Sequence, residues 1–145
     1  MSKPNSGFYN GTLGSKAQLI QELRNQNIKF SEHDILFITR DKTRQIIWLE
    51  TGNKSAGLKH ILDGNGTTRG HADDFQNAFG ISRSDVPAYL EQVISNGTVV
   101  SNTLKPAGRQ MGFERTYYYN GEHHVIVGLG TNGLIVSAYP IRKRK

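Results

Sequence analysis

Hydrophobic and polar positions follow a helical period near the start of this chain. Apolar residues recur at the spacing of one helix face over residues 15–27, a pattern typical of an amphipathic helix. Ser15 and Gln18 have the spacing of a capping box, in which each side chain caps the backbone of the other. The pattern therefore predicts a helix over residues 15–27. Residues 1–14, rich in Asn, Gly and Ser, are expected to form a linker or tail.

The next two apolar segments have the composition of strands. Residues 35–40 and 45–50 are rich in β-branched and aromatic side chains and are separated by Asp41-Lys42-Thr43. This arrangement predicts a hairpin. Trp48 stands in an otherwise apolar strand, so we expect it to anchor the core rather than to stack on a base.

The middle of the chain returns to helical patterns. A short helical turn over residues 58–62 would contain His60, and residues 71–79 form a second helix that ends at Gly80. Residues 84–96 form a third helix. Its expected cap is Ser84, and it has a proline in its first turn, where a missing backbone donor costs little.

From Gly97 onward the pattern is that of strands. Asn120-Gly121 is the strongest short hairpin signal in the chain. The predicted strands are residues 98–102, 114–119, 123–129 and 134–139. Helices followed by an antiparallel meander indicate an α+β fold.

The composition indicates a globular domain and a polyanionic partner. The chain has 145 residues, of which 36% are hydrophobic and 21% charged, enough for one globular domain with a buried core. Its net charge of +6 favours a polyanion such as nucleic acid as the partner. The absence of cysteine excludes disulfides, thiolate nucleophiles and Cys-based zinc sites. No membrane-spanning run and no signal-peptide pattern occurs, so a soluble domain is expected.

Two histidines stand at the ends of the glycine-rich segment HILDGNGTTRGH, residues 60–71. Glycine lets the backbone bend, so His60 and His71 can reach one substrate. Because imidazole titrates near neutral pH, one can act as the base and the other as the acid. This division of roles suits RNA cleavage. A histidine metal site, two incidental histidines and a phosphate-binding loop are alternatives, although the P-loop pattern is absent.

Three stretches resemble the EndoU family of endoribonucleases: the segment HILDG, the pair Gly70-His71 and the segment Ser137-Ala138-Tyr139-Pro140. The resemblance covers about residues 55–140. It is strongest to the bacterial EndoU domains at the C-termini of contact-dependent inhibition toxins and other polymorphic toxins. Arg69 stands where the family often has glycine, and Ser137 stands where threonine is common.

The resemblance implies a site. His60 and His71 match the two catalytic histidines, and Ser137 and Tyr139 match the pair that positions the nucleotide. The family's catalytic lysine lies between the second histidine and this pair, an interval in which Lys105 is the only lysine. A cation there would stabilise the charge that develops on the phosphoryl oxygens. The expected substrate-binding residues are Arg69, Gly70, Arg109 and Arg115, and the last two are alternatives to Lys105 as the cation.

The resemblance also implies a fold and an activity. The fold is that shared by barnase, EndoU, colicins and RelE, with N-terminal helices packed on a twisted antiparallel sheet whose exposed face holds the site. The activity is a metal-independent and cofactor-independent endoribonuclease that cleaves RNA, with tRNA the expected substrate, to 2′,3′-cyclic phosphate and 5′-hydroxyl ends.

The biological setting comes from the same resemblance. Residues 15–145 would be a monomeric toxin domain, delivered as the C-terminal domain of a larger secreted or surface protein into the cytoplasm of a target bacterium. An acidic immunity protein is the expected partner, because charge complementarity speeds its capture of a basic nuclease.

Other functions stay open. A different nuclease on the same fold would use residues 57–60 with Arg109 and Arg115. A noncatalytic RNA-binding module would use the net charge and the tyrosines. A metal-dependent nuclease would use histidine with the adjacent pair Asp73-Asp74.

The aromatic residues of the predicted hairpin bear on RNA binding. Residues 117–119 are three consecutive tyrosines, and alternation along a strand sends some of them to the core and leaves others to stack on bases. His123 and His124 alternate in the same way, so they cannot form one site together.

Overall fold

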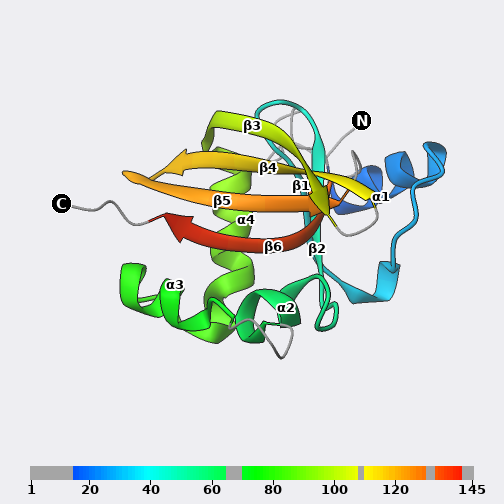
Figure 1. The fold of residues 1–145 in the computed structure, drawn as a ribbon. Coiled ribbons are helices and arrows are strands. Elements are labelled where there is room, and N and C mark those ends of the chain that lie inside the picture. Colours follow the sequence, from blue (N-terminus) through cyan, green and yellow to red (C-terminus); the bar gives the residue numbers. More distant parts are fainter. Residues whose placement is uncertain (1–14, 65–69, 108–109, 130–132, 142–145) are drawn as a thin grey trace.

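The computed structural model describes residues 15–64, 70–107, 110–129 and 133–141, with backbone alone at 105–107, 110 and 129. Within these residues, four helices and two short 3-10 turns accompany a six-stranded sheet (Figure 1). The predicted α+β class is confirmed, as is the packing of helices on a largely antiparallel sheet.

Helix α1 spans Lys16–Asn25. Both halves of the predicted capping box are present, since Ser15 Oγ accepts from Gln18 N and Gln18 Oε1 accepts from Ser15 N. The helix ends earlier than predicted, because Asn27 adopts a left-handed φ of 59° that turns the chain away from the helical path.

Strands β1 (Ile35–Arg40) and β2 (Ile46–Glu50) form the predicted antiparallel hairpin. Trp48 is fully buried, as predicted, and its Nε1 donates to Glu50 Oε2 at 2.9 Å. Together with α1, the hairpin encloses a small apolar cluster, which consists of Leu19, Ile20, Leu23, Ile35, Ile38, Ile46 and Trp48.

The three central helices are α2 (Leu58–Asp63), α3 (Ala72–Phe79) and α4 (Val86–Asn96). Helix α3 ends at Gly80 in the left-handed conformation, as predicted. Helix α4 begins later than predicted, after a 3-10 turn over Arg83–Asp85. Ser84 therefore lies within that turn, and α4 begins without a side-chain cap.

The C-terminal half contains strands β3 (Thr98–Ala107), β4 (Gln110–Tyr119), β5 (Glu122–Leu129) and β6 (Leu134–Ile141). Asn120 and Gly121 both have positive φ, as a two-residue hairpin turn requires. Strands β3 and β4 are both longer than predicted, and β3 continues through Pro106. A proline is tolerated here because β3 is an edge strand.

The strand order is β1-β2-β6-β5-β4-β3. All neighbours are antiparallel except β2 and β6, which run parallel through a single residue pair, Trp48 and Leu134. The sheet is thus mixed rather than wholly antiparallel. The meander of β3 to β5 sets the direction of β6, and β6 then meets β2 in the parallel sense.

The two faces of the sheet differ. On one face, alternate residues of β4 to β6 join α2, α3 and α4 in the main core, which includes Phe75, Leu90, Phe113, Tyr117, Ile126 and Ala138. In Figure 1, α4 lies behind β4, β5 and β6. We call the opposite sheet surface the front face; it includes Glu114 and Tyr118 of β4, and Ser137 and Tyr139 of β6. Within the described ranges no helix is long and apolar enough to cross a membrane.

Candidate active site

The two described ends of the segment from His60 to His71 lie next to each other. His60 lies in α2, which begins where the Gly57 amide donates to the Val136 carbonyl of β6 at 3.2 Å. His71 lies just before α3, and its backbone N–H donates to the Ile61 carbonyl at 2.6 Å. The backbone of His71 is therefore joined to the residue that follows His60.

Gly70 allows the backbone before His71 to approach the backbone of α2 closely. A Cβ atom at residue 70 would lie 2.1 Å from the Leu62 carbonyl oxygen and 2.4 Å from the Asp63 nitrogen. Both neighbours are backbone atoms of α2, which cannot move aside as a flexible side chain could. Glycine at this position thus has a structural reason, the close approach of two backbone segments.

The His60 ring is held through one nitrogen. Its Nδ1 lies 2.6 Å from the carbonyl oxygen of Lys54. A carbonyl only accepts, so Nδ1 must donate the hydrogen. In the neutral ring Nε2 is then the unprotonated nitrogen, and the ring is half-exposed.

The His71 ring is held in two ways. Its Nδ1 donates to Asp74 Oδ2 at 2.7 Å, one turn along from it at the start of α3. Its ring also stacks on Tyr139, with centroids 5.0 Å apart and planes inclined by 29°. The His71 side chain is 29% exposed, and its bond to Asp74 fixes the tautomer in which Nε2 of the neutral ring is unprotonated.

Tyr139 connects this histidine to the centre of the front face. Its hydroxyl donates to Glu114 Oε2 at 3.1 Å. Burial, followed by the nearby Glu114 carboxylate, raises the pKa of Tyr139 above its ordinary value. The phenol therefore stays protonated and acts as a donor. Glu114 lies in β4 directly across from Val127, which in turn pairs with Ser137.

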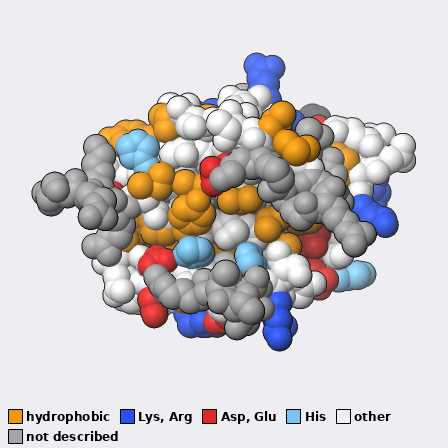
Figure 2. All heavy atoms as spheres, in the orientation of Figure 1, with side chains coloured by type: hydrophobic (Ala, Val, Ile, Leu, Met, Phe, Trp, Pro, Cys, Tyr) orange, Lys and Arg blue, Asp and Glu red, His pale blue; other side chains and the backbone are white. Residues whose placement is uncertain are grey.

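Ser137 and Tyr139 lie on the same face of β6, as the alternation of a strand predicts. The intervening Ala138 is fully buried in the core, whereas Ser137 and Tyr139 are each half-buried. In Figure 2, histidine side chains line the lower border of a hydrophobic strip, between the sheet and the helices α2 and α3. The site is thus a border region where the helices meet the front face.

Several predicted residues lie outside the described part. Arg69 and Arg109 are not described, and Lys105 is described only as backbone. In the β3–β4 ladder Lys105 pairs with Gly112, two residues along from the pair of Thr103 and Glu114. The roles of these three residues stay predictions.

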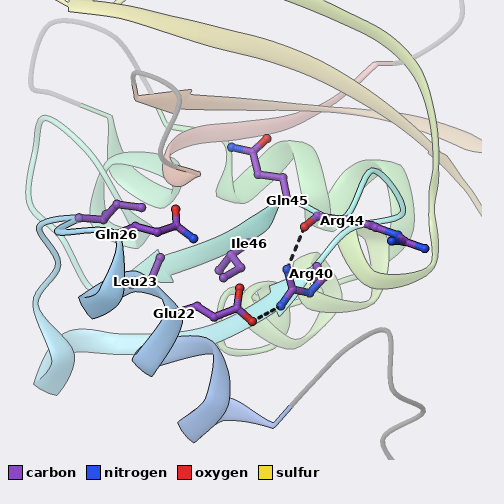
Figure 3. Close-up of a pocket in the computed structure, with 8 residues that line it drawn as sticks. Glu22, Leu23, Gln26, Arg40, Arg44, Gln45 and Ile46 are labelled. Carbon is purple, nitrogen blue, oxygen red and sulfur yellow. Dashed lines mark hydrogen bonds and ion pairs between the residues drawn. The ribbon is translucent and has the colours of Figure 1, made fainter.

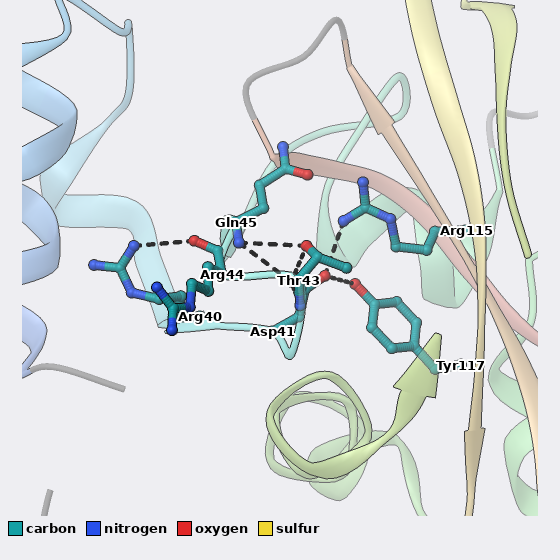
Figure 4. A network of polar contacts seen from close by, with 7 residues as sticks. All are labelled: Arg40, Asp41, Thr43, Arg44, Gln45, Arg115 and Tyr117. Carbon is teal, nitrogen blue, oxygen red and sulfur yellow. Dashed lines mark hydrogen bonds and ion pairs between the residues drawn. The ribbon is translucent and has the colours of Figure 1, made fainter. Parts of the chain in front are cut away.

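Arg115 does not join this group. Its side chain lies on the helix-facing side of β4 and is buried, with the residue 6% exposed. Figure 4 shows Arg115 and Tyr117 converging on Asp41 at the β1–β2 turn. Arg115 Nη1 donates to Asp41 Oδ2 at 2.8 Å, and the Tyr117 hydroxyl donates to the same oxygen at 2.5 Å. The expected contact of Arg115 with substrate is corrected: its side chain instead holds the β1–β2 turn against β4.

His123 and His124 face opposite sides, as predicted. His124 is buried, with Nδ1 3.4 Å from the Tyr117 carbonyl and Nε2 2.5 Å from the Tyr89 hydroxyl. Burial raises the pKa of Tyr89 to about 12, so this hydroxyl remains a donor to the histidine. His124 is therefore a core residue, and only His123 can take part in a surface site.

A separate cavity of about 180 Å³ lies between α1 and the β1–β2 turn (Figure 3). Arg40 lines it but is already engaged by the Glu22 carboxylate at 2.6 Å and by the Arg44 carbonyl at 3.0 Å. None of the residues predicted to act in catalysis lines this cavity. Among the described residues, no group of three or more His, Asp or Glu is placed to hold a metal ion.

Two residues of the site were not assigned these contacts from the sequence. Asp74 was considered only as a metal ligand, although its spacing of three residues from His71 on a helix places the two side chains together. Glu114 had no such local signal. Its contact with Tyr139 depends on the order and register of β4, β5 and β6.

No model of a known protein family matches the chain, and no curated protein matches it.

Proposed function

We propose that this protein is a metal-independent endoribonuclease that cleaves RNA by attack of a ribose 2′-hydroxyl on the adjacent phosphate. The observation that carries the proposal is the environment of His71. Its Nδ1 is bonded to Asp74, its ring is stacked on Tyr139, and its backbone is bonded to the residue after His60. Imidazole groups held in this way suit proton transfer near neutral pH.

The two histidines divide the proton transfers. His71 Nε2 takes the 2′-hydroxyl proton while the 2′-oxygen forms a bond to phosphorus. The bond from phosphorus to the 5′-oxygen breaks, and protonated His60 gives its Nε2 proton to that oxygen. The products are a 2′,3′-cyclic phosphate and a 5′-hydroxyl, and the two histidines end with their protonation states exchanged.

His71 is assigned as the base because of Asp74. A carboxylate bonded to Nδ1 fixes the tautomer that presents Nε2, and it stabilises the imidazolium that forms when a proton is taken up. His60 has a neutral carbonyl as its Nδ1 partner instead. The Lys54 carbonyl accepts from the His60 Nδ1–H group in both the neutral and the protonated ring, so this contact is kept when His60 gives up its Nε2 proton.

The remaining roles concern binding and charge. Ser137 and Tyr139, on one face of β6, position the nucleotide through a hydroxyl and an aromatic ring. Lys105 supplies the cation that stabilises the developing phosphoryl charge, which Asp74 and Glu114 cannot do. Arg69, Gly70 and Arg109 remain the proposed substrate contacts.

We further propose tRNA as the substrate and a toxin as the biological role, with an acidic immunity protein that binds the basic nuclease in its own cell and action in the cytoplasm of a target bacterium. The net charge of +6 supports both an RNA substrate and an acidic inhibitor. A pull-down against the product of the neighbouring coding region, with no complex and no inhibition, would remove the immunity partner.

The test is cleavage of total tRNA and of a uridine-containing oligonucleotide in excess EDTA, with the end groups mapped. We expect cuts that leave 2′,3′-cyclic phosphate, lost by at least 100-fold in His60→Ala and in His71→Ala. His33→Ala, an exposed histidine before β1, is the matched control and should cleave normally.

Other outcomes identify the alternatives. Cleavage that needs an added divalent ion would favour the metal-dependent nuclease. Tight, salt-sensitive RNA binding by intact protein without any cleavage would favour the binding module. Full activity in folded His60→Ala or His71→Ala would refute the two-histidine mechanism.

A further inference from the structure

The front face has a second group of side chains beyond the candidate active site. Tyr118 of β4 and His123 of β5 are directly opposite each other in the sheet register. Their ring centroids lie 5.0 Å apart, with planes inclined by 55°. Ile141 of β6 is the next residue across, paired with His123. We call Tyr118, His123 and Ile141 the aromatic row, after its two aromatic members.

This row is accessible. Tyr118 is 45% exposed and Ile141 is 41% exposed, so both belong to the exposed large apolar side chains of the described part of the chain. Tyr117, next to Tyr118, and His124, next to His123, are buried on the other side of the sheet. The aromatic row is therefore the surface half of an alternating pattern whose other half forms the core.

The row also lies next to the candidate active site. Tyr139 pairs with Val125, and His123 is two residues before Val125 on the same strand. Such diagonal neighbours in an antiparallel pair lie about 7–8 Å apart. Two bases that stack on each other in a helix are about 3.4 Å apart along the strand. A nucleotide at Tyr139 and a second base at the aromatic row must accordingly be unstacked from each other.

We propose that the aromatic row is a subsite for one nucleobase of single-stranded RNA, the base of a nucleotide that flanks the one bound at Ser137 and Tyr139. This inference rests on the proposed ribonuclease function and adds a substrate class to it. The subsite selects RNA whose bases are splayed apart, as in loops and single strands, over continuous duplex.

The size of the row favours a base over a protein partner. Three partly exposed side chains offer roughly 300 Å² of surface, whereas a specific protein interface buries about 800 Å² on each partner. A single base covers an area close to that of the aromatic row, and much less than that of a protein interface. An aromatic ring stacks on any base, so the subsite contributes affinity without strict sequence preference.

The test uses an RNA that binds without being cut. A fluorescent uridine heptamer with 2′-O-methyl riboses throughout lacks the attacking hydroxyl, so its anisotropy reports binding alone. We expect Tyr118→Ala to raise Kd by about 5- to 150-fold, which corresponds to the loss of one base stack. Tyr118→Phe keeps the ring and should bind normally. Leu104→Ala removes an exposed apolar side chain from the opposite side of the sheet and should also bind normally.

A second series identifies the base. Each position of the heptamer is replaced in turn by an abasic nucleotide. At one position we expect the abasic substitution and Tyr118→Ala to be non-additive, because both remove the same contact. Equal losses at every position, or additive losses throughout, would overturn the subsite.

The remaining outcomes separate this inference from the proposed function. Wild-type protein that cleaves RNA while Tyr118→Ala binds as tightly as wild type would refute the subsite alone. Protein that neither binds nor cleaves RNA would refute both. A wild-type dimer that becomes monomeric in Tyr118→Ala, detected by light scattering, would assign the row to a second copy of the chain and overturn the proposal.

Discussion

The rings of His71 and Tyr139 lie against each other with their centroids 5.0 Å apart, although one residue precedes α3 and the other is near the end of β6. The Tyr139 hydroxyl is bonded to Glu114, and the His71 ring is bonded to Asp74. Each ring is therefore fixed at its polar end and packed on its face. The contribution of the Tyr139 ring can therefore be tested separately from that of its hydroxyl.

Tyr139→Ala removes the surface against which the His71 ring is packed. We expect kcat for RNA cleavage to fall by roughly 10- to 100-fold, since a small misplacement of a catalytic group has effects of this order. Tyr139→Phe keeps the ring and removes only the bond to Glu114, so its kcat should lie between those of wild type and Tyr139→Ala. Single-turnover cleavage measures both variants. Wild-type rates in both would show that the stacked pair has no part in catalysis.

Asp74→Asn tests the role of the carboxylate in fixing the His71 tautomer. An amide can present either its oxygen or its NH2 group to Nδ1, so the tautomer is no longer defined. We expect kcat to fall by roughly 10- to 100-fold, with a changed pH profile. Nitrogen NMR of His71 should show the Nδ1–H tautomer in wild type and a mixture in the variant.

Asp73→Asn is the matched control, because it changes the same charge one residue earlier in the first turn of α3. Its kcat and its His71 tautomer should stay those of wild type. Equal losses in the two variants would attribute the effect to net charge rather than to the bond between Asp74 and His71.

Gly70→Ala tests the close approach of the returning segment to α2. The added Cβ would meet backbone atoms at 2.1 and 2.4 Å, so α2 and His71 must separate. We expect a loss of about 1–3 kcal/mol in the free energy of unfolding and a clear loss of cleavage. Gly80→Asn is the control, since residue 80 is left-handed with nothing within 4 Å of an added Cβ and asparagine tolerates that conformation. Urea unfolding at fixed pH distinguishes them.

Arg115→Met tests the buried ion pair. Asp41 would lose its positive partner while remaining buried, and breaking such a pair costs about 3–5 kcal/mol. Arg83→Met breaks an exposed pair with Asp63 and should change the free energy of unfolding little. Both are measured by urea unfolding. If Tyr139→Phe and Ser137→Ala are silent, the alternative nuclease with an arginine-based site gains support, with Arg109 as its arginine because Arg115 is buried against Asp41.

His124 makes stability depend on pH. Burial lowers the pKa of His124, by more than the Tyr117 carbonyl and Glu122 raise it. The stabilisation is complete above about pH 6.5, where the unfolded histidine is neutral, and it is lost as the pH falls through that value towards the lower pKa of the folded state. The slope from this group is at most about 1.4 kcal/mol per pH unit.

The measurement is the urea midpoint from pH 7.5 to 5. We expect His124→Gln to flatten the dependence between pH 7 and 5.5, whereas His123→Gln, on the opposite side of the same strand, should reduce it only slightly, because the charge of His123 is a minor cause of the lowered pKa of His124. A wild-type midpoint that does not fall over this interval would contradict the buried neutral histidine.

Helix caps and tight turns could be predicted from the sequence, whereas the lengths of two strands could not. The capping box at Ser15, the left-handed Gly80 and the turn at Asn120-Gly121 were all predicted and are present. The full lengths of β3 and β4 were not predicted. Proline and glycine near their shared turn hide the strand pattern, and pairing in the sheet overrides that local signal.

Caps, turns and strand alternation depend on neighbours a few residues apart, so most local elements and the α+β class could be predicted from the sequence, whereas the chemistry of the candidate residues stays a prediction. Three other features are visible only in the folded chain: Tyr139 meets His71 and Glu114, Arg115 is buried against Asp41, and β2 and β6 run parallel. The physical reason is that these contacts depend on strand order, register and the packing of segments far apart in the chain. No local pattern of residues specifies those distances.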